Sequence, residues 1–211
     1  HADRGSRSAG LPLAAARERR FRPDWSGYRP PIPRFIGTRV LPDVPLGELL
    51  DYIDWMPFFN AWEFSGKFPD ILTDPLRGAA ATQLYDDARR MLRQLVRERW
   101  LRAQAVFGFF PAASAGDDIL VYADASRERV LARLHQLRQQ KARPDGLPQL
   151  CLADFVAPGE GGPADYIGAF AVTTGIGIEE HVARFEAAAD DYSAILLKAL
   201  ADRLAEALAE A

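Results

Sequence analysis

The segment from 49 to 62 constrains the fold of this chain most, because it places an acid, Asp54, among aromatic side chains. Within eleven residues it holds five aromatic residues: Tyr52, Trp55, Phe58, Phe59 and Trp62. Aromatic side chains bury more apolar surface than other residues, so we expect this segment to pack into a core. Pro57 disfavours the α conformation at the residue before it and should stop a helix from running through. We therefore expect Asp54 and Trp55 at a helix end, one turn short of an irregular aromatic segment.

Two interpretations of Asp54 stay open on these residues alone. An unpaired charge is costly to bury, so a carboxylate among aromatic rings favours a pocket that a positively charged group neutralises. Asp is also common at helix caps and turns, so Asp54 can equally cap the turn that leads into Met56 and Pro57. Composition by itself favours the structural cap.

The composition is that of an ordinary globular protein. With 211 residues, 48% of them hydrophobic and 26% charged, the chain is long enough to bury a substantial core. A net charge of -3 without a basic run argues against a nucleic-acid partner. Three dispersed histidines argue against a metal site, and no apolar run reaches the length of a membrane span. The single cysteine, Cys151, excludes an internal disulfide and favours a reducing, cytoplasmic location.

Hydrophobic patterns and turn residues predict an α+β fold, with a mainly antiparallel twisted sheet, surrounding helices and a long C-terminal helix. Strands are expected near residues 35–41, 104–110, 118–122, 130–134 and 166–173, the last as a buried strand. The segment 127–140 also fits a helix, although we favour a strand over 130–134. Helices are expected over 11–20, 46–52, 76–100, 179–188 and 192–211, a proline-rich arm over 21–33, and a flexible linker over 1–10.

The last predicted helix carries an apolar stripe and an acidic column on different faces. The stripe consists of Leu197, Leu200, Leu204 and Leu208, and the column of Asp202, Glu206 and Glu210. Acids four residues apart repel each other mildly, so the column does not stabilise the helix by itself. It is either a solvated face or a docking strip for a cationic group of another domain. No sequence motif indicates a nucleophile with a neighbouring general base, so no catalytic residue is predicted.

Several blocks of the sequence resemble, in the same order, the activation domain of cobalamin-dependent methionine synthase. They cover residues 52–59 with Trp62, 66–69, 108–112, 116–119, 137–140, 152–158, 165–173 and 198–207. The family enzyme moves a methyl group from methyltetrahydrofolate to homocysteine by way of cobalamin. The resemblance implies a domain that binds S-adenosylmethionine and, with an electron from a flavoprotein such as flavodoxin, supports remethylation of oxidised cobalamin. The cobalamin itself would be held by a neighbouring domain of the same polypeptide.

The resemblance also assigns roles to individual residues. Asp54 falls on the family's acid that contacts the amino group of S-adenosylmethionine, where charge pairing and cation–π contact would both be available. Asp202 and Glu206 fall on acids that meet a histidine of the cobalamin domain after it leaves cobalt, and an acidic pair would favour the protonated histidine.

The sequence departs from the family pattern at its end. The family continues to an Arg-Pro-Ala-Pro-Gly-Tyr motif that holds the carboxylate and adenine of S-adenosylmethionine, whereas this chain ends at Ala211. We therefore expect a domain over 11–211 that is incomplete at its C-terminus and binds S-adenosylmethionine weakly or undetectably by itself. The alternative function is a non-catalytic module that docks a cobalamin domain or a flavodoxin-type reductase.

Overall fold

A computed structural model describes residues 10–141, 143–144 and 146–211, so the predicted linker lies, apart from Gly10, outside the described residues. The chain divides into two compact units. The first unit contains the chain up to Thr38 together with Gly108–Ala169, and the second contains Arg39–Phe107 together with Phe170–Ala211. Helices and strands both contribute, which confirms the predicted α+β class.

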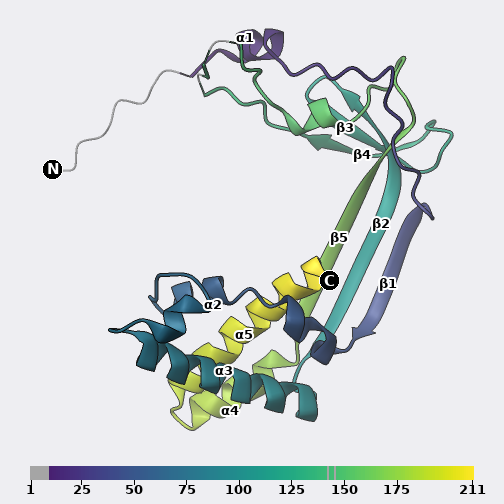
Figure 1. The fold of residues 1–211 in the computed structure, drawn as a ribbon. Coiled ribbons are helices and arrows are strands. Elements are labelled where there is room, and N and C mark those ends of the chain that lie inside the picture. The colour runs from purple at the N-terminus through teal and green to yellow at the C-terminus, as the bar shows by residue number, and fades with distance from the viewer. Residues whose placement is uncertain (1–9, 142, 145) are drawn as a thin grey trace. The chain divides into compact units, whose positions relative to one another are not determined.

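The strands form a five-stranded sheet in the order β1-β2-β3-β4, with β5 also paired to β2 (Figure 1). Their bounds are β1 Gly37–Val44, β2 Arg102–Ala115, β3 Asp118–Tyr122, β4 Val130–His135 and β5 Asp165–Ile176. β2 and β3 are antiparallel, with Ala112 opposite Val121, and the turn between them contains Gly116 at a positive φ of 68°. β3 and β4 are also antiparallel, which confirms the strand predicted at 130–134.

The first unit contains the part of β2 from Gly108 onward, β3, β4, the short helix α1 (Leu13–Glu18) and the 3₁₀ helix η3 (Leu152–Phe155). Its core is small and consists of Ala112, Ile119, Cys151 and Ala153. The predicted arm over 21–33 forms neither helix nor strand. The ring of Phe21 packs against that of Phe155 with their centroids 5.4 Å apart, so aromatic contact attaches the arm to this unit.

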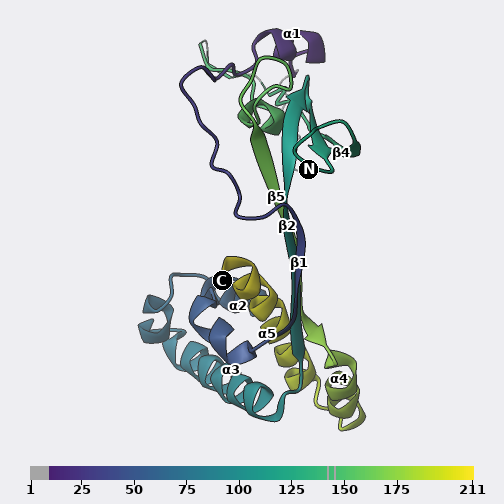
Figure 2. The ribbon, with the colours of Figure 1, turned by 90° about the vertical axis from the view of Figure 1, so that its right-hand side faces the viewer.

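The second unit is mainly helical, as Figure 2 shows. It contains η1 (Leu46–Tyr52), α2 (Trp55–Ala61), η2 (Asp70–Thr73), α3 (Gly78–Glu98), α4 (Ile178–Ala187) and α5 (Asp191–Glu210). α5 packs against η1, α2, α3 and α4. Leu197, Leu200 and Leu204 are fully buried, which confirms the predicted apolar stripe of the C-terminal helix. None of the described helices is long and apolar enough to cross a membrane.

One prediction about the sheet is wrong. β5 is a strand, but it is not buried along its length, since Gly168, Ala169 and Ala171 are exposed and Phe170 is 63% exposed. Neither core cluster includes the middle of this strand. An apolar run indicates what a strand can bury, whereas the elements packed on it determine how much it does bury.

Candidate functional site

Asp54 is the N-cap of α2. Its backbone is extended, with φ at -77° and ψ at 114°, and its Oδ1 accepts a hydrogen bond of 3.0 Å from the backbone N–H of Met56. Such a cap satisfies one of the amide groups that the first turn of a helix leaves without a partner. The capping interpretation of Asp54 is therefore confirmed. The expectation that Pro57 stops a helix and leaves an irregular aromatic segment is wrong, because Asp54 begins α2 and Pro57 lies in its first turn, where proline is tolerated.

The aromatic residues of the same segment do not enclose the carboxylate. Phe58 and Phe59 are buried in the core, at 1% and 0% exposure, while Asp54 is exposed. Trp55 is half-buried, and its ring meets that of Tyr85 edge-on at a centroid distance of 4.7 Å. The expectation of an acid surrounded by aromatic rings is thus wrong, because α2 turns its rings toward the core and leaves its cap at the surface.

The carboxylate of Asp54 can nevertheless still accept a hydrogen bond from a ligand. Over the described residues, no lysine or arginine forms an ion pair with it, and its Oδ2 accepts no hydrogen bond. A hydrogen bond from the backbone N–H of Met56 holds the side chain in one orientation. A cationic group can therefore reach an oriented carboxylate without first displacing a protein cation.

The two acids that were singled out on α5 share an arginine between them. Arg203, whose side chain is 8% exposed, donates from Nη2 to Asp202 Oδ2 at 2.6 Å and from Nη1 to Glu206 Oε2 at 2.5 Å. A second bond joins Nη2 to Glu206 Oε1 at 2.7 Å. Burial acts to lower the pKa of Arg203, but the hydrogen bonds that Arg203 donates to the two carboxylates outweigh it and raise that pKa. The acids themselves are exposed.

The structure brings the predicted site residues into one unit. Asp54 lies at the junction of η1 and α2, and both of these elements pack against α5, which carries Asp202 and Glu206 (Figure 1). Within the described ranges, no group of three or more His, Cys, Asp or Glu side chains could hold a metal ion. As carboxylates, Asp54, Asp202 and Glu206 offer charge pairing and hydrogen-bond acceptors.

A cleft of about 540 Å³ lies in the same unit, between η1, the strands and the end of α5. Its walls are mostly apolar and consist of Leu41, Val44, Glu48, Leu49, Tyr52, Ala105, Phe107, Phe170, Val172, Leu208, Ala209 and Ala211. Tyr52, two residues before Asp54, is 47% exposed there. The volume falls within the range of small-molecule pockets, about 300–1,000 Å³.

A family model for the activation domain of vitamin B12-dependent methionine synthase matches residues 45–211. The chain belongs to this family. It is also similar to a crystal structure of a MetH reactivation domain bound to AdoHcy, with 46% sequence identity and a TM-score of 0.91. That similarity covers 96% of this chain and 62% of the other, so the chain spans less than two thirds of the length of the chain it matches.

Two features of this activation domain were not predicted from its sequence. The pairing of Arg203 with both acids was missed, although the spacing of three residues between Arg203 and Glu206 was a usable signal. The cleft was missed because its walls come from five separate segments of the chain, and no local pattern joins them.

Proposed function

We propose that this activation domain binds S-adenosylmethionine and supports the reductive remethylation of oxidised cobalamin in a methionine synthase, a methyltransferase of the cytoplasm. The observation that carries this proposal is 46% identity, over 96% of the chain, to a reactivation domain bound to AdoHcy. AdoHcy is what S-adenosylmethionine becomes when its methyl group leaves, so a site that fits one fits most of the other.

In this proposal Asp54 holds the amino group of S-adenosylmethionine. Its unused Oδ2 and its fixed orientation support the assignment, since a charge-assisted hydrogen bond needs an acceptor with a free lone pair. The residue stands at the protein surface, where water weakens charge pairing, so Asp54 supplies one contact of several. The apolar cleft that includes Tyr52 is the volume in this unit that suits the less polar adenosyl part.

Asp202 and Glu206 are proposed to meet a protonated histidine of a cobalamin-binding domain. Asp202 is the better acceptor of the two, because its Oδ1 has no hydrogen bond within the described structure, whereas Arg203 uses both oxygens of Glu206. Electrons would come from a flavodoxin-type flavoprotein. When bound, S-adenosylmethionine supplies the methyl group, and this chain's own residues bind and orient it.

The test compares Asp54→Asn with Asp51→Asn in a methionine synthase that carries this domain. Asn caps a helix about as well as Asp, so Asp54→Asn removes the charge and leaves α2 intact. Asp51 is a nearby exposed acid on η1 and provides the matched loss of charge. We expect calorimetry to show AdoHcy binding weakened about tenfold or more by Asp54→Asn, as for a lost charged hydrogen bond, and unchanged by Asp51→Asn.

Activity measurements separate a binding role from a folding role. Asp54→Asn should slow the S-adenosylmethionine-dependent reactivation and leave primary methyl transfer to homocysteine unchanged. An equal loss of both activities would contradict the proposal and assign Asp54 to folding alone. If the domain is only a docking module, the unaltered enzyme will not bind AdoHcy at all.

A further inference from the structure

A second pocket, of about 290 Å³, lies within the first unit. The arm after α1 forms one wall, and the β2–β3 turn and the η3 region form the rest. The lining residues are Arg20, Phe21, Arg22, Pro23, Trp25, Ser114, Gly116, Ala153, Asp154, Val156 and Pro158. None of them takes part in the site proposed for S-adenosylmethionine.

The charge in this pocket is positive. Arg20 and Arg22 are exposed, and over the described residues neither guanidinium has a hydrogen-bond or ion-pair partner. The single acid of the lining, Asp154, is already neutralised by the buried Arg138, which donates to its two oxygens at 2.7 and 2.8 Å. Two arginines therefore remain to bind an anion, and their planar guanidinium groups match the geometry of carboxylate and phosphate oxygens.

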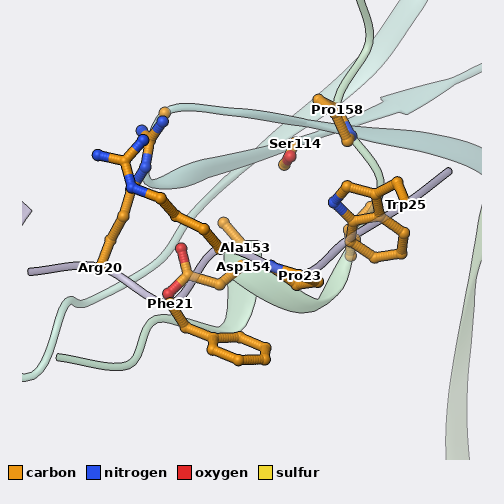
Figure 3. A pocket seen from close by; sticks show the side chains of 11 residues that line it. Arg20, Phe21, Pro23, Trp25, Ser114, Ala153, Asp154 and Pro158 are labelled. Atoms are coloured by element: carbon orange, nitrogen blue, oxygen red, sulfur yellow. The ribbon is translucent and has the colours of Figure 1, made fainter. Parts of the chain in front are cut away.

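The pocket also offers neutral donors and an aromatic wall. The indole N–H of Trp25 and the hydroxyl of Ser114 donate to no acceptor within the described structure, and Trp25 is half-buried. In Figure 3, Arg20 and Trp25 lie on opposite sides of the pocket, with Ser114 and Asp154 between them. The pocket thus has a cationic side and an aromatic side, and a ligand that fits both carries its charge at one end.

The floor of the pocket is held rigidly. Arg138 has a fully buried side chain and also bonds Asp117 at 2.7 Å, while the backbone N–H of Cys151 donates to Asp154 Oδ2 at 3.0 Å. These bonds tie the β2–β3 turn to η3. A floor that needs no rearrangement reduces the entropy that a ligand loses on binding.

We propose that this pocket binds a small aromatic molecule that carries a phosphate or carboxylate group. The anion lies against Arg20 and Arg22, and the ring stacks on Trp25, with Ser114 as a donor between the two. The pocket volume is close to the lower limit for typical ligand pockets, about 300 Å³. This restricts the ligand to a single ring or a small fused ring system. This site is separate from the one proposed for S-adenosylmethionine.

The test uses phenyl phosphate, benzoate, orthophosphate and phenol as probes of the whole protein, by calorimetry in the presence of saturating AdoHcy. AdoHcy occupies the other proposed site, so any remaining binding reports on this pocket. Phenyl phosphate or benzoate should bind, and the tighter of the two identifies the anion. Phenol, which lacks the charge, should bind at least about tenfold more weakly. Binding should weaken as salt is added, because the arginines are exposed.

Substitutions assign the binding to this pocket. Arg20→Gln and Arg22→Gln should each weaken binding about tenfold, and Ser114→Ala about threefold, as for a neutral hydrogen bond. Arg93→Gln, at an exposed arginine of α3 in the second unit, removes the same charge and should have no effect. Arg20 and Arg22 are exposed, so their variants should fold, which circular dichroism verifies.

Three results would overturn the proposal. Binding that is unchanged in both arginine variants would place the ligand elsewhere. Orthophosphate that binds as tightly as phenyl phosphate would remove the role of the aromatic wall. No binding of any of the four probes would mean that the two arginines are only solvated surface residues.

Discussion

Each unit of this protein contains an arginine that holds two acids, and the two clusters differ in their access to water. In the inner clamp, Arg138 bonds Asp117 and Asp154, with side-chain exposures of 0%, 11% and 4%. In the outer clamp, Arg203 bonds Asp202 and Glu206, with exposures of 8%, 70% and 60%. The bonds in both are 2.5 to 2.8 Å long, so geometry alone does not distinguish them.

The difference in exposure assigns the two clamps different roles. Buried carboxylates need their arginine for stability, because removal of one partner leaves an uncompensated buried charge. Acids that water reaches can lose the arginine at little cost and can also meet a group from outside. The inner clamp is therefore structural. The outer clamp is a surface on which a cationic group of a partner can compete with Arg203 for the two carboxylates.

The largest expected effect is that of Arg138→Met, which breaks the inner clamp. The variant should lose about 3–5 kcal/mol of stability in the first unit, since Asp154 would stay buried without a cation and Asp117 would keep only its exposed partner Arg17. Hydrogen exchange over η3, measured against denaturant, reports this loss for the unit concerned.

Cys151 provides a second readout of the same variant. The residue is 2% exposed, and burial raises the pKa of its thiol, so the thiol should resist alkylation in the intact protein and react quickly in Arg138→Met. Arg133→Met removes an exposed ion pair with Asp118 in the same unit and serves as the control. Slow alkylation in both variants would contradict a structural role for the inner clamp.

The next largest effect is expected when the pH is lowered, which should weaken the inner clamp. Burial acts to raise the pKa of Asp117, but hydrogen bonds from Arg17 and Arg138 hold that pKa below its ordinary value. The ionised group therefore stabilises the first unit at neutral pH, and this contribution is lost as pH falls from about 4, the unfolded value, through the lower folded value. Stability measured against pH should be flatter below pH 4 in Asp117→Asn. An identical slope in both proteins would contradict the assignment.

The smallest effect is expected for Arg203→Met in the outer clamp. Met keeps most of the apolar stem packed, and the freed carboxylates of Asp202 and Glu206 stay in water, so stability should fall by about 1 kcal/mol or less. Denaturant unfolding of this variant beside Arg138→Met measures the contrast directly. A loss as large as that of Arg138→Met would mean that the outer clamp is structural too, and the comparison would fail.

The local parts of the fold could be predicted from the sequence. The apolar faces of α3 and α5 follow a helical period, and Gly116 with its neighbours marks the turn between β2 and β3. The cap at Asp54 follows from the preference of Asp for helix N-termini. Each of these signals acts over a few neighbouring residues, which is the range over which a sequence pattern determines backbone conformation.

Only the tertiary structure decided which of these residues are buried and which charges are paired. The rings near Asp54 pack inward and its carboxylate does not, β5 has an exposed middle, and Arg138 meets acids that lie 16 and 21 residues away. Burial and pairing depend on segments that are distant in the chain. The free energy of a charge depends on the water around it, which the folded protein sets and local sequence does not.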